Sequence, residues 1–296
     1  MIQTESVAKR HGSVVALEHV TLEIRQGFTA IIGPNGAGKS TLLATIGRLV
    51  GADAGTITVG GLDVVTTRSR ELARRLAILR QDNHLAIRLS VEDLVGYGRF
   101  PHGRSGRTAD DRAHVERALD LLDLQPVRRR FLDELSGGQR QRAFVAMALA
   151  QNTDHLLLDE PLNNLDPRHA VALMKLLTEL AEQRGLTIVV VMHDINTAAQ
   201  FADSIIAMKD GRIHCHGTVD DVVTVPNLST LYETPVRVER IGERRVLELV
   251  AKYGVDTFAA AVTDYMDLGE RRARAALANI PEGSYSFAEE QDSGAI

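Results

Sequence analysis

A glycine-rich loop that ends in lysine, serine and threonine constrains the fold of this chain more than any other feature. The short apolar stretch Thr29-Ala30-Ile31-Ile32 leads directly into Gly33-Pro34-Asn35-Gly36-Ala37-Gly38-Lys39-Ser40-Thr41. A buried strand, a glycine loop and a following helix together form a nest of backbone N–H groups that fits a phosphate. Residues 38–49 are predicted to form that helix. The sequence therefore predicts a phosphate-binding loop (P-loop) within an α/β fold.

Two side chains of this loop suit a nucleoside triphosphate and its magnesium ion. Lys39 can reach the β- and γ-phosphates, and the Ser40 hydroxyl can coordinate Mg²⁺. A glycine-rich turn without a ligand is the alternative, but the strand before the loop and the helix after it argue against that interpretation. ATP and Mg²⁺ are the expected ligands, and the residues expected to hold ATP here are Gly33, Pro34, Asn35, Gly36, Ala37, Gly38, Lys39, Ser40 and Thr41.

An acidic pair ends a second apolar strand. Residues 155–158 are followed by Asp159 and Glu160. A carboxylate at the end of a buried strand is costly unless it meets a cation, so Asp159 is a candidate magnesium ligand. Glu160 is suited to polarise a water molecule for in-line attack on the γ-phosphate. The alternative is a helix N-terminus that carries acidic residues, and the upstream P-loop argues against it.

The rest of the nucleotide-binding region alternates strands and helices. Residues 188–192 are a further predicted buried strand, and it follows a helical segment, as does the strand at 155–158. This order is typical of a mostly parallel sheet. Near the start, residues 14–24 and 55–59 are predicted to be antiparallel strands. We therefore predict an α/β fold with a mostly parallel core sheet and an antiparallel β subdomain.

After residue 81 the pattern becomes helical. Ser90 is a predicted N-cap because acidic first-turn residues follow it. Residues 109–124 carry apolar side chains at helical spacing. Ser136 is likewise suited to cap the helix that follows it. We predict a helical insert over about residues 82–150.

A boundary is expected near Val246, which divides the chain into residues 1–246 and an extension of residues 247–296. The extension is predicted to be mostly helical. Its amphipathic stripe ends at Pro281 and consists of Val255, Phe258, Val262, Met266, Ala273, Leu277 and Ile280.

The stretch Leu135-Ser136-Gly137-Gly138-Gln139 lies between the P-loop and the acidic pair. With those motifs it resembles the signature of the ATP-binding cassette (ABC) ATPases, and the resemblance covers roughly residues 1–245. In that family, the signature of one subunit closes over the ATP held by another. The resemblance implies the P-loop NTPase fold, a homodimer with composite ATP sites, and contacts to the partner's ATP from Ser136, Gly137, Gly138 and Gln139.

The same resemblance implies roles for three other side chains. Gln81 stands where the family carries the glutamine that senses Mg²⁺ and the γ-phosphate. Asp166 ends a stretch similar to the D-loop, which crosses the dimer interface. His193 matches the switch histidine that contacts the γ-phosphate, although a histidine after an apolar strand is usually structural. The implied catalytic residues are Glu160, His193 and Gln81, and the implied magnesium ligands are Ser40, Gln81 and Asp159.

One position departs from the family pattern. Most members place an aromatic ring, usually tyrosine, where this chain has His11, and that ring stacks on adenine. An imidazole can stack as well, but it offers less area. We expect His11 to contact adenine more weakly and in a way that depends on pH.

The segment after Gln81 narrows the class of ABC protein. Residues 90–102 resemble the "TVxDxVxxGRxPH" stretch of importers for iron chelates and vitamin B12, and residues 159–166 and 192–196 look closest to the ferric-siderophore branch. The resemblance implies an ATPase subunit that works with an integral-membrane permease and, indirectly, with a substrate-binding protein. Importers of cobalamin, haem or another chelate remain alternatives, as does a non-transport ABC ATPase that acts on a macromolecule.

The extension resembles a different family. Residues 247–287 are similar to a segment of the hydantoinase B/oxoprolinase family. Roughly forty residues are too few for that enzyme, so we expect a fused fragment without hydantoinase activity. The alternatives are a regulatory or docking tail and a bifunctional hydrolase.

Composition limits the remaining classes of function. The net charge of −5 gives no broad cationic field, so we expect no nucleic-acid partner. The basic run at residues 128–130 is interpreted as a solvated helix end. Cys215 is the single cysteine, which precludes an internal disulfide and suits a reducing cytosol. Its neighbours His214 and His216 could form half a metal site, but a solvent-facing strand explains them better.

No apolar stretch near the N-terminus is typical of a signal sequence. The apolar runs, such as residues 187–192, are far shorter than the ~20 residues that span a bilayer. We therefore expect a peripheral protein on the cytoplasmic side of the cell (inner) membrane.

Overall fold

The computed structural model describes residues 1–81, 87–103, 108–241 and 244–249. One compact unit spans Met1–Glu248, and the remainder of the chain begins at Leu249. The amphipathic stripe predicted for the extension lies outside the described residues.

A six-stranded sheet forms the core of this unit. Its strand order is β10-β9-β3-β8-β7-β6, and every neighbouring pair is parallel except β10 with β9. The mostly parallel sheet predicted from the sequence is confirmed. Its strands are β3 (Gly27–Ile32), β6 (Leu76–Leu79), β7 (His155–Asp159), β8 (Thr187–Val191), β9 (Ser204–Lys209) and β10 (Arg212–Thr218).

A four-stranded antiparallel sheet, in the order β2-β1-β4-β5, forms a separate layer. The two predicted strands of this region each pair with β1 rather than with each other. The strands are β1 (Ile2–His11), β2 (Val14–Ile24), β4 (Ala54–Val59) and β5 (Leu62–Asp63). A further hairpin consists of β11 (Val236–Ile241) and β12 (Arg244–Leu249).

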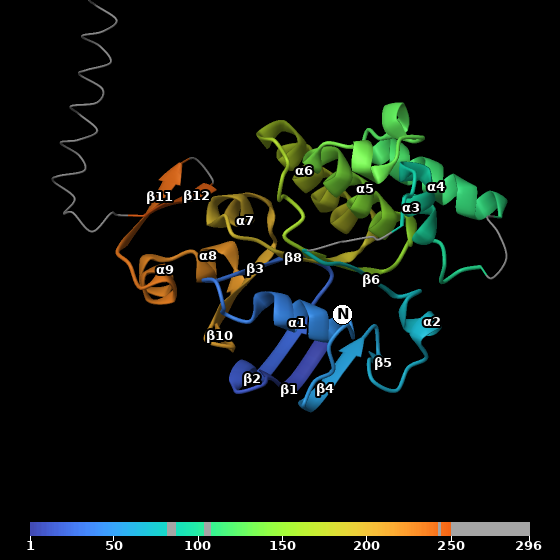
Figure 1. Cartoon of the computed structure of the whole chain (residues 1–296). Coiled ribbons are helices and arrows are strands. Elements are labelled where there is room, and N and C mark those ends of the chain that lie inside the picture. The colour runs from blue at the N-terminus through green and yellow to red at the C-terminus, as the bar shows by residue number, and fades with distance from the viewer. Residues whose placement is uncertain (82–86, 104–107, 242–243, 250–296) are drawn as a thin grey trace, which may run out of the picture. The chain divides into compact units, whose positions relative to one another are not determined.

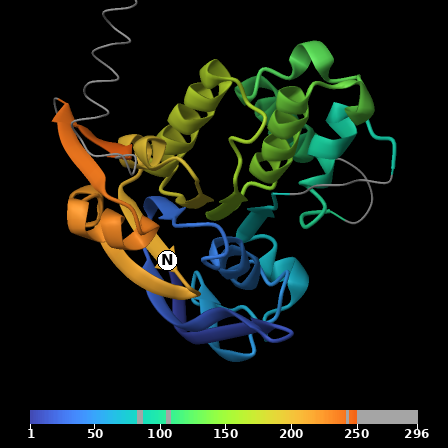
Figure 2. The ribbon, with the colours of Figure 1, turned by 60° about the vertical axis from the view of Figure 1, so that its left-hand side comes forward.

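Helices cover both faces of the core sheet. In Figures 1 and 2, α1 lies between the core sheet and the antiparallel sheet, and α3, α4, α5 and α6 lie on the opposite face. The helices are α1 (Lys39–Ile46), α2 (Ser69–Leu72), α3 (Val91–Tyr97), α4 (Ala109–Leu121), α5 (Gly137–Ala150), α6 (Pro167–Arg184), α7 (Ile195–Phe201), α8 (Val219–Val222) and α9 (Val225–Tyr232), with 3₁₀ turns at Gln125–Val127 and Leu132–Glu134.

Alternate residues of each central strand point to opposite faces of the sheet, so each strand enters two cores. In β3, Ala30 and Ile32 pack in the core beneath α5 and α6, whereas Ile31 packs in the core around α1. In β8, Val190 packs in the core beneath α5 and α6, and Val191 packs in the core around α1. This burial on both faces explains why these strands are continuous apolar runs in the sequence.

The predicted helical insert contains α3, α4 and α5, and all three begin at side-chain caps. Ser90 accepts a hydrogen bond from the Asp93 N–H, and Ser136 forms a reciprocal capping box with Gln139. The predicted helix at 109–124 ends three residues early, at Leu121. Its chain then turns back, because the Leu124 N–H donates to Leu119 O at 2.9 Å.

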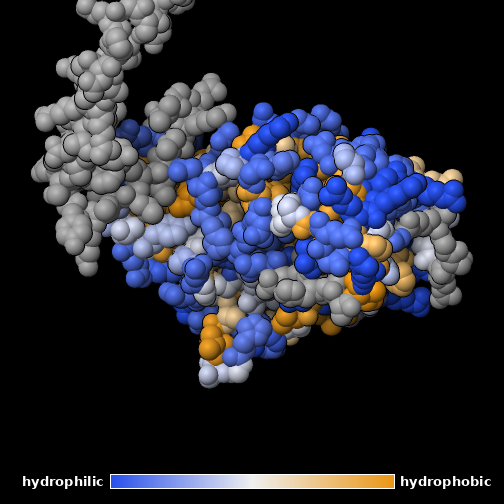
Figure 3. All heavy atoms as spheres, turned by 45° about the horizontal axis from the view of Figure 1, so that its top comes forward, coloured by the Kyte–Doolittle hydropathy of each residue, from blue (hydrophilic) through white to orange (hydrophobic). Residues whose placement is uncertain are grey.

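The histidine–cysteine–histidine run lies in β10, after a turn at Asp210 and Gly211, which both have positive φ angles. The described residues contain no group of three or more His, Cys, Asp or Glu side chains that could hold a metal ion. Among the same residues, no helix is both long enough and apolar enough to cross a bilayer. Hydrophilic side chains cover most of the coloured surface on the face in Figure 3.

Candidate nucleotide site

The P-loop connects β3 to α1 in a conformation that two of its glycines make possible. Gly33 and Gly38 have φ angles of +144° and +95°. A Cβ on Gly33 would lie 2.1 Å from Met208 O, and a Cβ on Gly38 would lie 2.4 Å from Ala16 O. Any side chain at either position would therefore collide with backbone, so both positions need glycine. With glycine there, the loop can adopt the conformation that directs its N–H groups inward.

Lys39 holds its ammonium group inside this loop. Its Nζ donates to Gly33 O at 2.8 Å and to Pro34 O at 2.9 Å, and the residue is 6% exposed. Burial lowers the pKa of Lys39, while the nearby carboxylates of Glu160 and Asp159 oppose that shift. The ammonium group is thus held at the loop by two carbonyl oxygens, and a phosphate can replace these contacts.

Asp159 ends β7 beside the first turn of α1. The Ser40 hydroxyl donates to Asp159 Oδ1 at 3.0 Å. Burial raises the pKa of Asp159, the Ser40 hydrogen bond opposes that shift, and the adjacent Glu160 carboxylate adds to it. A hydroxyl and a buried carboxylate are the hard oxygen donors that Mg²⁺ prefers, and a cation here would remove the cost of burying the carboxylate. These residues therefore fit a magnesium ion.

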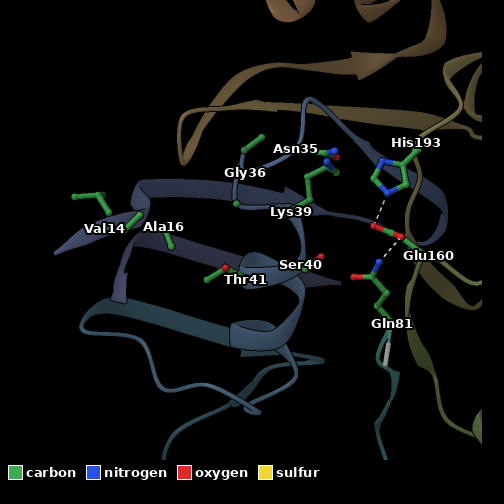
Figure 4. Close-up of a pocket in the computed structure, with 13 residues that line it drawn as sticks. Val14, Ala16, Asn35, Gly36, Lys39, Ser40, Thr41, Gln81, Glu160 and His193 are labelled. Atoms are coloured by element: carbon green, nitrogen blue, oxygen red, sulfur yellow. Dashed lines mark hydrogen bonds and ion pairs between the residues drawn. The ribbon is translucent and has the colours of Figure 1, made fainter. Parts of the chain in front are cut away.

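Glu160 is the centre of a hydrogen-bond network that comes from three separate segments. Its Oε2 accepts from Gln81 Nε2 and from Asn163 Nδ2, both at 2.7 Å, and its Oε1 lies 2.5 Å from His193 Nε2. Figure 4 shows Gln81 and His193 directed at the carboxylate from opposite sides. Glu160 is 8% exposed and has a φ of +50°, so its position is closely constrained.

These side chains surround one open pocket of about 430 Å³. It brings together most of the predicted P-loop residues with Gln81, Glu160 and His193 (Figure 4). Residues that the sequence analysis did not predict, Val14, Val15 and Ala16, form another part of the wall. The complete lining is Val14, Val15, Ala16, Asn35, Gly36, Ala37, Gly38, Lys39, Ser40, Thr41, Gln81, Glu160 and His193.

His11 and Asp159 line an adjoining hollow of about 210 Å³. The two hollows share Ser40, Thr41 and Gln81. His11 is the last residue of β1, at the tip of the hairpin that carries Val14. The structure thus places the imidazole beside the start of α1, and its contact with adenine stays a prediction.

The signature residues do not line the pocket of their own chain. Ser136 and Gly137 are exposed at the N-terminus of α5. Asp166 is also exposed, where it caps α6 and bonds to His169 through the backbone N–H and through Nδ1 at 2.7 Å. This placement leaves both segments accessible to a second chain.

The sequence did not predict two contacts at this site. Asn163 binds the Glu160 carboxylate, and Gln141 donates from α5 to Pro161 O at 3.2 Å. Asn163 directly precedes the stretch Asn164-Leu165-Asp166 that resembles the D-loop, but nothing in the local sequence indicates where its side chain points. Gln141 lies just after the signature, and its partner is 20 residues away in the chain.

A P-loop after β3, an acidic pair at the end of β7, a histidine after β8 and an antiparallel subdomain together define an ATPase of the ATP-binding-cassette class. Comparison with known proteins agrees with this class. The ABC transporter family model matches residues 17–163, and the hydantoinase B/oxoprolinase model matches residues 232–296. The chain belongs to the ATP-binding proteins of the ABC transporter family.

Individual relatives match over most of their own length. The petrobactin import ATP-binding protein YclP of Bacillus subtilis is 44% identical over 83% of this chain and 98% of its own length. The petrobactin import ATP-binding protein FatE of Bacillus anthracis is 48% identical over 80% of this chain and 96% of its own. A solved dimeric ATP-binding cassette, in a post-hydrolysis state bound to ADP and Pi, matches with a TM-score of 0.68 and 31% identity over 74% of this chain and 99% of that one.

The match to hydantoinase B/oxoprolinase begins at residue 232, earlier than the predicted boundary at 246. It therefore includes the end of α9 and the hairpin β11–β12 as well as the extension. The predicted resemblance of the extension is confirmed, whereas its function is untested.

Proposed function

We propose that this chain is the ATP-hydrolysing subunit of an importer for ferric siderophores. The observation that carries the proposal is the similarity to YclP and FatE, two petrobactin import ATP-binding proteins, along almost their entire length. Further relatives include the ferric enterobactin transport ATP-binding protein FepC of Escherichia coli, at 40% identity. We propose that the permease and the substrate-binding protein select the ligand.

The pocket geometry supports a distinct role for each side chain in ATP hydrolysis. Lys39 and the P-loop N–H groups bind the phosphates, while Ser40, Asp159 and Gln81 hold Mg²⁺, which neutralises phosphate charge when bound. Glu160 accepts a proton from the attacking water as the new P–O bond forms and the bond to the ADP oxygen breaks. His193 and Gln81 position Glu160 in the structure described here, and they are within reach of a γ-phosphate in the same pocket.

The exposed signature supports a working unit of two chains. Ser136–Gln139 and Asp166 lie outside the pocket of their own chain, so they complete a composite site only when a second copy approaches. Ser136 then offers a hydroxyl, and α5 offers its positive dipole end, to the partner's ATP. His11 contacts the adenine.

The importer comprises the paired cassettes, an integral-membrane permease and, indirectly, a substrate-binding protein. The cassettes act at the cytoplasmic face of the membrane through the permease, which docks on the helical insert at about residues 82–150. The ATPase domain comprises residues 1–246. Residues 247–296 are an appended fragment without hydantoinase activity.

The test reconstitutes the full chain with its co-purified permease and binding protein in liposomes. ATP hydrolysis should rise when the binding protein carries a ferric catecholate or hydroxamate siderophore, and the labelled iron complex should enter. Stimulation by cobalamin or haem alone would refute the siderophore proposal. Purification with no membrane partner would instead favour a non-transport ATPase.

A further inference from the structure

One buried contact joins the loop after Glu160 to helix α5. The Gln141 side chain donates from Nε2 to Pro161 O at 3.2 Å, and the residue is 8% exposed. Pro161 is buried as well and directly follows Glu160. A buried amide–carbonyl hydrogen bond holds two segments together, because breaking it leaves both groups without a partner.

The same loop also packs against the first turn of α5. A Cβ on Gly138 would lie 3.0 Å from Asn164 O, and a Cβ on Gly137 would lie 3.3 Å from Asn164 Cβ. The loop therefore packs directly against the helix backbone at two glycines, where no flexible side chain can move aside. Asn164 has a φ of +64°, so the loop holds a restricted conformation at this contact. A displacement of the loop has to be passed on to the start of α5.

The other end of the loop lies at the nucleotide pocket. Gln81 and His193 both bind the Glu160 carboxylate and both line the pocket. A ligand that attracts either side chain changes the forces on Glu160, and Pro161 is the next residue. The loop therefore has the nucleotide pocket at one end and the signature helix at the other.

We propose that Gln141 is a positioning residue that couples the nucleotide pocket of a chain to that chain's own signature segment, Ser136–Gln139. The inference rests on the proposed function, in which this segment serves the ATP bound by the partner. ATP in the pocket of one chain then positions the signature of that chain, and this signature closes over the ATP in the partner's pocket. Because coupling between two sites is reciprocal, each pocket influences the other through the Gln141–Pro161 contact.

The test compares two substitutions on adjacent residues of α5. Gln141→Leu removes the amide donor and keeps a buried side chain of similar size. Arg142→Met is the matched control, because Arg142 Nη1 also donates to one backbone oxygen, Leu122 O, at 3.0 Å. Leu122 lies at the end of α4, away from the loop after Glu160. Both substitutions are made in the otherwise unchanged full chain, so that the Glu160 carboxylate stays in place, and an ATP analogue that cannot be hydrolysed stands for ATP in both measurements. ATP binding to the monomer and ATP-driven dimer formation are then measured separately.

We expect ATP affinity of the monomer to change by less than about twofold in both variants, because neither residue lines the pocket. Gln141→Leu should need about tenfold more ATP for half-maximal dimer formation, since it loses a buried hydrogen bond that contributes to closure. Its Hill coefficient should fall toward unity, whereas Arg142→Met should retain the parental value.

The outcomes separate the two proposals. A parent chain that binds the analogue and never dimerises refutes the composite site of the proposed function. A parent that dimerises without cooperativity, or a Gln141→Leu variant that follows the same ATP dependence as Arg142→Met, overturns the coupling and leaves the proposed function intact. Thermal melts check folding. If Gln141→Leu does not fold, Gln141→Asn is used, because its amide is one methylene too short to reach Pro161.

Discussion

Replacing Arg99 with methionine should destabilise the helical insert strongly. The Arg99 side chain is 5% exposed and lies where α3, α4 and α5 meet. Its Nε donates to Asp111 Oδ1 at 2.9 Å, and its Nη1 donates to Ala150 O at 3.0 Å. Asp111, near the start of α4, has an equally buried side chain. Arg99→Met preserves much of the volume and leaves this carboxylate without its cation.

The expected loss follows from this burial. Removing one partner of a buried ion pair costs about 3–5 kcal/mol of unfolding free energy. Thr108 still donates to Asp111 Oδ2 from its N–H at 3.0 Å and from its hydroxyl at 2.9 Å. The pair with Asp110, whose side chain is 74% exposed, adds little. We therefore expect the lower end of the range, about 3 kcal/mol.

The pH dependence has a definite sign. Burial acts to raise the pKa of Asp111, but the hydrogen bonds from Arg99 and Thr108 outweigh burial and lower that pKa from 3.8 to about 2. The stabilisation is therefore complete above the unfolded value of 3.8, and it is lost as the pH falls from there toward about 2. The stability difference between Arg99→Met and the parent should shrink over the same interval.

Urea unfolding, followed by circular dichroism near neutral pH, measures the loss. The exposed Arg112→Met, also on α4, is the matched control and should change stability by less than about 0.5 kcal/mol. Adding Asp111→Asn to Arg99→Met should recover part of the loss, because the neutral amide needs no cation. A loss below about 1 kcal/mol for Arg99→Met, or no recovery in the double variant, would refute the reasoning.

Three further predictions concern the ATP site and the extension. Glu160→Gln should bind ATP but hydrolyse it at a small fraction of the parental rate, and near-normal turnover in a phosphate-release assay would exclude Glu160 as the base. Lys39→Ala should lose most ATP affinity and Ser136→Arg should block closure, yet a mixture of the two should recover partial activity from one intact composite site; no recovery, together with no ATP-driven dimer, would contradict pairing. Deletion of residues 247–296 should leave ATP hydrolysis in place and alter the melting temperature only modestly, whereas a folded, dimeric truncation without ATPase activity would show that the extension is required.

Local chemistry made much of the fold and the site predictable from the sequence. The P-loop, the acidic pair at Asp159 and Glu160, and the caps at Ser90 and Ser136 depend on residues a few positions apart. Backbone conformation and short-range hydrogen bonding decide such features, so the residue types alone indicate them. Apolar runs that enter two cores likewise identified the central strands.

Helix ends were less predictable. The helices expected at 38–49 and 109–124 end at Ile46 and Leu121. Apolar residues continue past both ends: Leu122 and Leu124 stay in the core while the chain turns, whereas Leu49 is exposed. Periodicity reports which side chains are buried, and it does not report where the backbone leaves the helical conformation.

Contacts between distant segments were decided by the tertiary structure alone. Gln81 and Glu160 are 79 residues apart in the chain, yet Gln81 Nε2 lies 2.7 Å from Glu160 Oε2. Gln141 on α5 likewise donates to Pro161 O, which lies 20 residues further along the chain. Arg99 belongs to a stretch that marked the class of importer, yet only packing shows that it holds three helices together. Side chains meet across a sheet or between helices because strand order and helix packing place them there, and these long-range arrangements leave no local pattern in the sequence.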